Sequence, residues 1–304
     1  NSGTITTATI SGGTATLNGG VTGTATVTGA NTEVTLGANV NEIDFAGKTL
    51  TQNGRTITTA TVSGGTANFG TATDTANSAV TTAIINGGAV TSGIKNTITS
   101  LTLNSADSAT FNGSIGEAVI ASTFAGKTAT FNNNITTKAT VHAGTINLNG
   151  TTASVEQDGG EVNLYGNLSG NLVHNGGEFN INVANGATKT ISGTITGNST
   201  GEININEIAG YNGSLILNNT VSGDSLIQHK GTVDVNSTVN SNYTINSGIL
   251  NANAGSNLSS LNVLNGTVNV KGATAQATIK NTNTWTDGVI NLSNGTLTLG
   301  TSST

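Results

Sequence analysis

The chain has 304 residues, of which 34 % are hydrophobic, 3 % aromatic and only 8 % charged, with 42 glycines and neither proline nor cysteine. Without cysteine, a disulfide framework and a thiolate metal site are both excluded. The formal net charge of −6, without any cluster of basic residues, argues against a nucleic-acid partner, and no apolar run is long enough for membrane insertion by this segment.

The first half of the chain contains two long duplications. Residues 4–17 reappear almost unchanged as residues 56–69, and residues 45–49 reappear as residues 124–128. The second alignment continues without a gap into the middle of the chain, so it places the first half in the same repeating frame as the second half. Duplicated modules of this kind are typical of repeat architectures.

From residue 144 onward, one short phrase recurs, made of a glycine, any residue, an apolar residue, usually Asn or Thr, and another apolar residue. The phrases begin at Gly144, Gly160, Gly177, Gly231, Gly266 and Gly288, with weaker copies at Gly193, Gly213 and Gly248. One strand signature per period marks a chain that coils and stacks on itself. The sequence therefore predicts an all-β parallel β-helix, or β-solenoid, with rungs of about 16–22 residues. It predicts one continuous solenoid over residues 1–304.

The alternation within each phrase predicts which side chains point inward. Two apolar residues separated by one polar residue are typical of a strand with one buried face. The predicted core consists of Ile146, Leu148, Val162, Leu164, Phe179, Ile181, Val233, Val235, Val268, Val270, Ile290 and Leu292. The predicted outward ladder, whose amides hydrogen-bond along the stack, consists of Asn68, Asn147, Asn163, Asn180, Asn204, Asn269 and Asn291.

The repeat texture also carries a family resemblance. Residues 56–67 (TITTATVSGGTA) and 43–50 (IDFAGKTL) resemble passenger domains of bacterial autotransporters, including those of rickettsial outer-membrane protein B and of diffuse-adherence adhesins. The resemblance implies a right-handed β-helix displayed outside a Gram-negative cell, with a host receptor or glycan as partner. Because the chain opens on Asn1 rather than Met, we expect a segment or processed part of a longer surface protein.

An enzyme is the first alternative. Glu161 and Glu178 occupy the same slot in successive phrases, so their carboxylates are expected about 5 Å apart, near the separation of a retaining glycosidase pair. This spacing suits a polysaccharide lyase or hydrolase. However, such enzymes usually bind sugar rings on aromatic side chains in a cleft built by long loops. This chain has only one tryptophan and three tyrosines, and its turns are short. The prediction is therefore a solvated glutamate stack and no catalytic residues.

The sequence gives less support to ice, metal ions and cofactors as ligands. The alternation of Thr4 with Thr6, and of similar threonine pairs at residues 14–16 and 24–26, suits an ice-binding face, but from residue 144 onward the slot is mostly Asn. His142, His174 and His229 precede phrase glycines and are predicted to be isolated surface imidazoles, so no metal site is expected. No cofactor is expected either, because the Gly-Lys-Thr triplets at residues 47–49 and 126–128 lack the first glycine of a phosphate-binding loop.

The leading hypothesis is a non-enzymatic, extracellular structural or adhesive solenoid that forms a spacer, a surface coat or a fibre. Strand signatures run almost to both ends of the chain, leaving no room for caps. Since uncapped solenoid ends expose strand edges and core, we expect end-to-end self-association or contact with neighbouring passenger segments.

Overall fold

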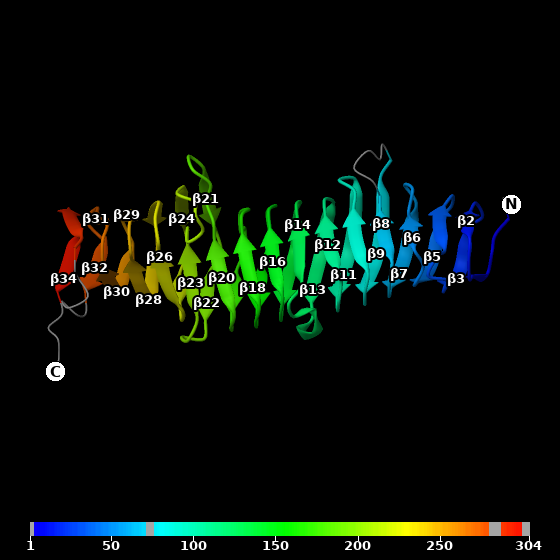
Figure 1. Ribbon diagram of the computed structural model, residues 1–304. Coiled ribbons are helices and arrows are strands. Elements are labelled where there is room, and N and C mark those ends of the chain that lie inside the picture. The colour runs from blue at the N-terminus through cyan, green and yellow to red at the C-terminus, as the bar shows by residue number, and fades with distance from the viewer. Residues whose placement is uncertain (1–2, 71–75, 280–286, 300–304) are drawn as a thin grey trace. The chain divides into compact units, whose positions relative to one another are not determined.

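The computed structural model describes residues 3–70, 76–279 and 287–299, and it divides into two compact units, Asn1–Thr151 (unit 1) and Thr152–Thr304 (unit 2). Each unit is all-β, and its parallel strands are stacked turn upon turn, as Figure 1 shows. The predicted β-solenoid is thus confirmed. Within the described ranges the single helix is the 3-10 turn η1 (Ser122–Phe124), and no helix there is long and apolar enough to cross a membrane.

Unit 1 contains two parallel ladders of strands. Ladder A consists of β1 (Ala8–Ile10), β3 (Val21–Val27), β5 (Val40–Phe45), β7 (Thr56–Val62), β9 (Ser78–Ile85), β11 (Asn96–Leu103), β13 (Ser114–Ile120) and β15 (Ile135–Val141). Ladder B consists of β2 (Thr14–Leu17), β4 (Glu33–Leu36), β6 (Thr49–Thr51), β8 (Thr66–Phe69), β10 (Ala89–Ser92), β12 (Ser108–Phe111), β14 (Thr128–Phe131) and β16 (Thr145–Leu148).

The strands of unit 1 alternate between inward apolar and outward polar residues. Because each rung has only a narrow interior to fill, a few large side chains are enough to form the core. On ladder B the last inward residue is Phe111 on β12 and Phe131 on β14, and these rings stack with centroids 5.1 Å apart. Both rings are at most 1 % exposed. Burying a phenylalanine of this kind contributes about 1.5–3 kcal/mol relative to leaving it exposed.

Unit 2 contains three ladders, two of which share strands. Ladder C consists of β18 (Glu161–Leu164), β20 (Glu178–Ile181), β23 (Glu202–Ile205), β26 (Ser225–Gln228), β28 (Thr238–Ile245) and β30 (Asn257–Val263). Ladder D consists of β21 (Thr188–Ile191), β24 (Ser214–Leu217), β27 (Thr232–Val235), β29 (Ile249–Ala252), β31 (Thr267–Lys271) and β33 (Val289–Ser293). Ladder E consists of β17 (Val155–Gln157), β19 (Leu172–His174), β22 (Ile195–Gly197), β25 (Val221–Ser222), the first halves of β28 and β30, β32 (Gln276–Ile279) and β34 (Thr296–Leu299).

The glycine phrases of unit 2 do not all lie on one ladder. Those at Gly160 and Gly177 precede ladder C, the weaker copy at Gly193 precedes ladder E, and those from Gly213 onward precede ladder D. The predicted single asparagine ladder is therefore wrong for this unit. Asn163, Asn180 and Asn204 are aligned on ladder C, whereas the asparagines of the later phrases align on ladder D.

Most residues of the predicted core are inward-facing. Ten of them are at most 1 % exposed, namely Ile146, Leu148, Val162, Leu164, Phe179, Ile181, Val233, Val235, Val268 and Val270. The assignment is wrong for Leu292, which is 54 % exposed, and Ile290 is only half-buried. Both lie on β33, which pairs with β31 on one side and, among the described residues, has no strand stacked on its other side.

The glycines at the corners are required by backbone geometry, and one adjacent pair tests this. Gly65 has φ +69°, and an added Cβ would collide with the carbonyl oxygen of Gly47, whereas a Cβ on Gly64 meets nothing within 4 Å. We expect Gly65→Ala to destabilise unit 1 by about 2 kcal/mol or more, because a left-handed conformation alone costs about 1–2 kcal/mol. Gly64→Ala is the matched control, with an expected change below about 0.5 kcal/mol. Denaturant titrations of both variants measure the difference, and equal costs would contradict the assignment.

Candidate functional site

A column of glutamates lies on the outer surface of ladder C. Glu161, Glu178 and Glu202 open β18, β20 and β23, and they are direct register partners. Neighbouring strands lie about 4.8 Å apart, so the column brings like charges close together. The sequence predicts the first two members of this column; the third, Glu202, was missed although residues 201–205 (GEINI) repeat the phrase.

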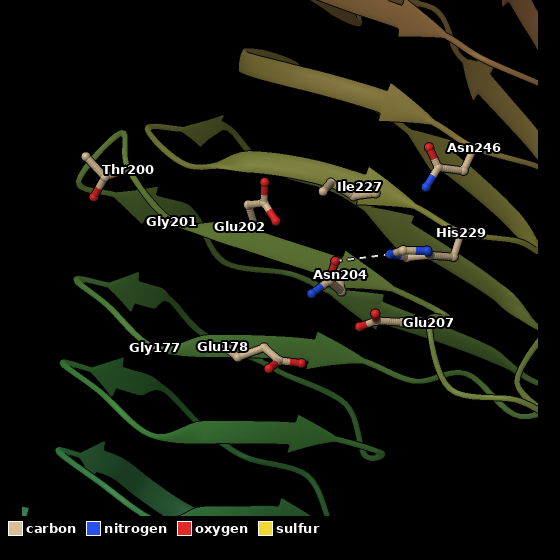
Figure 2. Close-up of a pocket in the computed structure, with 10 residues that line it drawn as sticks. All are labelled: Gly177, Glu178, Thr200, Gly201, Glu202, Asn204, Glu207, Ile227, His229 and Asn246. Atoms are coloured by element: carbon tan, nitrogen blue, oxygen red, sulfur yellow. Dashed lines mark hydrogen bonds between the residues drawn. The ribbon is translucent and has the colours of Figure 1, made fainter.

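A groove of about 530 Å³ opens beside this column (Figure 2). Glu178 and Glu202 line it from adjacent strands, and Glu207 lines it from the loop after β23. The remaining lining residues are Gly177, Thr200, Gly201, Asn204, Ile227, His229 and Asn246. Three carboxylates and no lysine or arginine give the groove an acidic character. Glu161 is not among the lining residues, so the predicted glutamate pair is only half within the groove.

The far side of the groove is built by His229, which follows β26. Its Nε2 lies 3.1 Å from Oδ1 of Asn204, and Figure 2 shows the two side chains directed toward one another. An imidazole N–H donating to the amide oxygen fixes the orientation of Asn204. The histidine is half-buried, not the isolated surface imidazole that the sequence predicts.

Two tyrosines lie close to the first glutamate of the column. The rings of Tyr165, after β18, and Tyr211 have centroids 5.5 Å apart and planes inclined by 44°. Burial raises the pKa of the Tyr165 phenol above its ordinary value, and the neighbouring Tyr211 and the Glu161 carboxylate raise it further. The phenol therefore stays neutral over the physiological pH range.

The asparagines behind the glutamate column are more buried than predicted. Asn163 is 4 % exposed and Asn180 is 2 % exposed, although both lie on the outer side of ladder C. Asn163 Nδ2 donates to Glu161 Oε1 at 2.7 Å, and Asn180 Nδ2 donates to Glu178 Oε1 at 2.8 Å and to Asn163 Oδ1 at 3.2 Å. The stacked amides and the glutamate stems cover one another, so these side chains are shielded without entering the core.

This burial changes the expected cost of substituting Asn163. The sequence alone predicts a mild effect for Asn163→Thr, because Thr suits an outward strand position. Thr cannot replace the amide bonds to Glu161 and Asn180, so we expect a loss of about 1–3 kcal/mol in the free energy of unfolding. Asn291→Thr, at an exposed ladder position, is the control and is expected to cost less than about 1 kcal/mol. Urea melts of the two variants compare them; a harmless Asn163→Thr would favour the sequence-based expectation.

A buried histidine–aspartate pair lies on the inner side of the same region. His174 and Asp224 are both 0 % exposed, and His174 Nδ1 lies 2.6 Å from Asp224 Oδ2. Asp224 Oδ1 also accepts the backbone N–H of Gly201 at 3.0 Å, while His174 Nε2 has no hydrogen-bond partner among the described residues. The prediction of a surface imidazole is wrong for His174, because the alternation of β19 turns Leu172 and His174 inward and Val173 outward.

The arrangement as a whole suits recognition of hydrogen-bond donors. Carboxylates and amide oxygens line the groove, and in the described part of the chain no three His, Asp or Glu side chains converge as metal ligands. Comparison with protein-family models, with curated proteins and with solved structures found no match to this chain. The functional argument therefore depends on the described residues.

Proposed function

We propose that this chain is a non-enzymatic, extracellular structural and adhesive β-solenoid. The observation that carries the proposal is the use of outward amides as connections between rungs. In unit 1, Asn132 Nδ2 donates to Asn112 Oδ1 at 2.8 Å, and Asn149 Nδ2 donates to Asn132 Oδ1 at 2.7 Å. In unit 2, Asn269 Nδ2 donates to Asn251 Oδ1 at 2.9 Å. Such repeated bonds stiffen a scaffold without forming a reactive site.

The resemblance of the repeats to autotransporter passengers supports display at a bacterial cell surface. Low charge and the absence of cysteine are compatible with that setting. In this proposal, the acidic groove beside Glu178 and Glu202 is the adhesive contact, and a glycan or receptor presenting hydroxyl or amine donors is its partner. Binding of the purified chain to arrays of neutral, acidic and amino-sugar glycans tests this. Loss of a positive signal in Glu178→Gln/Glu202→Gln would support the groove, and the absence of any binding would count against adhesion.

Self-association is part of the proposed structural role. The strands β33 and β34 expose Val289, Leu292 and Leu299 at 55 %, 54 % and 54 %. Exposed apolar side chains on edge strands favour pairing with another chain, and a second copy or a neighbouring passenger segment would cover them. Contacts between different ends of identical molecules grow into open filaments when the repeated rotation does not close into a ring.

The oligomeric state tests self-association directly. We expect the sedimentation coefficient of the purified chain to rise with concentration, and electron microscopy to show fibres. The variant Leu292→Lys/Leu299→Lys is expected to abolish the concentration dependence, whereas the control Val173→Lys, at another partly exposed apolar position, is expected to preserve it. A wild-type chain that remains monomeric at all concentrations would refute this part of the proposal.

A polysaccharide hydrolase or lyase remains the second candidate, because the groove contains carboxylates on adjacent rungs. The structure shifts the candidate pair from Glu161 and Glu178 to Glu178 and Glu202. Assays on acidic and neutral polysaccharides, with Glu178→Gln and Glu202→Gln as variants, distinguish the two functions. Turnover by the wild type that both variants lose would replace the structural proposal with an enzymatic one.

A further inference from the structure

The outward side chains of ladder B form one surface of unit 1, which we call the threonine face. Each strand contributes its first and third residue, and the strands follow one another regularly in Figure 1. In chain order the pairs are Thr14/Thr16, Glu33/Thr35, Thr49/Thr51, Thr66/Asn68, Ala89/Thr91, Ser108/Thr110, Thr128/Thr130 and Thr145/Asn147. Threonine thus fills most of the face.

The threonine face repeats in two directions. Successive strands lie about 4.8 Å apart, and alternate residues along a strand lie about 6.6 Å apart. No described pairing within ladder B contains a register shift. Ladder A is less regular, with shifts between Val21 and Thr24 on β3 and between Ile115 and Glu117 on β13. The threonine face therefore keeps an unbroken two-dimensional lattice of side chains over all the described strands of ladder B.

The face is also almost free of charge. Its one ionisable member is Glu33, whose Oε1 lies 2.7 Å from Lys48 Nζ, so its charge is paired locally. The outward residues of ladder A differ, because Glu42, Glu117 and Lys138 lie among them. An uncharged, regular surface is complementary to an uncharged, regular solid. It has few charged groups that could form ion pairs with a charged partner.

We propose that the threonine face binds ice. Each threonine presents a methyl group and a hydroxyl that both donates and accepts, and its branched side chain is restricted at χ1. The array is therefore organised before binding, which lowers the entropic cost of contact with an ordered water layer. No aromatic residue lies on the face, so a crystalline polysaccharide would find no platform for its rings. The proposal is independent of the adhesive groove in unit 2.

The sequence-based objection to ice binding has little weight within unit 1. The asparagines that interrupt the pattern after residue 144 lie almost entirely on ladders C and D of unit 2. Only Asn68 and Asn147 lie on the threonine face, and Thr91 Oγ1 donates to Asn68 Oδ1 at 2.9 Å within the lattice. The pair at residues 24–26, which the sequence also suggests, lies on ladder A instead.

Thermal hysteresis and ice-affinity partitioning of the full 304-residue chain test the proposal. We expect the wild type to depress the freezing point below the melting point and to enrich in growing ice. Thr51→Lys/Thr110→Lys places two charges on the threonine face and is expected to remove at least 80 % of the hysteresis. The matched control, Thr61→Lys/Thr102→Lys, changes outward, half-buried threonines of ladder A and is expected to retain it.

A second variant distinguishes loss of the threonine hydroxyls from loss of the fold. Thr51→Asn/Thr110→Asn introduces the residue that already occurs at equivalent positions of β8 and β16, so the fold is expected to be kept while the hydroxyl lattice is lost. Circular dichroism checks the fold of every variant. An inactive wild type, or equal losses on ladders A and B, would overturn the proposal.

Discussion

Replacing Phe179 with alanine is expected to lower the free energy of unfolding of unit 2 by about 3–5 kcal/mol. The ring is 0 % exposed and lies in register between Val162 and Ile203 on the neighbouring strands of ladder C. The rung cannot collapse around the vacancy without breaking its pairing on both sides. Phe179→Asp is expected to cost more still, because a carboxylate would enter an apolar interior without a partner.

The control for this substitution lies on the adjacent ladder. Val173 on β19 points outward and is 37 % exposed, so Val173→Asp adds the same carboxylate on the solvent side. Its cost is expected to stay below about 1 kcal/mol. Guanidinium denaturation followed by circular dichroism gives the free energies, and hydrogen exchange locates the rungs that open. Equal costs at Phe179 and Val173 would invalidate the inward and outward assignment.

Removing Asp224 is the second substitution with a large expected effect. Asp224→Ala leaves His174 buried with neither ring nitrogen bonded, and it also removes the acceptor for the Gly201 N–H. Leaving a buried polar group without its hydrogen-bond partner typically costs about 1–3 kcal/mol, and this substitution leaves two such groups. The residues come from three successive rungs, so the loss is expected to loosen the turns before β23 and β26 together.

A double-mutant cycle separates this pair from ordinary packing. If the pair acts as one unit, the free energies lost in His174→Ala and Asp224→Ala are not additive, and the double variant is less destabilised than their sum by at least about 1 kcal/mol. Strict additivity would mean that the 2.6 Å contact contributes nothing beyond the separate side chains. The matched control is His142→Ala, an exposed histidine of unit 1, which is expected to be neutral within about 0.5 kcal/mol.

The sequence predicts the rungs well because each rung of a solenoid is formed by residues that are close together in the sequence. Alternation placed Val162, Leu164 and Phe179 correctly in the core. It could not show which ladder a phrase joins, because the same in–out pattern suits any face. The change from ladder C to ladder D follows from longer segments between β20, β23 and β26, and their path depends on packing that the phrase does not encode.

The candidate site was harder to predict for a related reason. Glu161 and Glu178 share a slot in consecutive phrases, so their pairing was visible, whereas Glu207 and His229 reach the groove from turns that lack the repeat. The sequence does contain one signal for the buried pair of His174 and Asp224. Period-2 counting from Leu172 turns His174 inward, where an imidazole needs a partner, and Asp224 supplies it from fifty residues away.

The same glycine phrase precedes strands of ladder C and strands of ladder D, and this affects how the length of such chains can change. A phrase that folds equally well before ladder C or ladder D tolerates recombination between misaligned copies, because a crossover need not restore the original face. Each product would still present an inward apolar pair and an outward polar residue to the rung below. The length of the solenoid is therefore free to drift by gain or loss of partial turns, while each stretch of rungs acquires its own composition, rich in threonine in one stretch and in asparagine or glutamate in another.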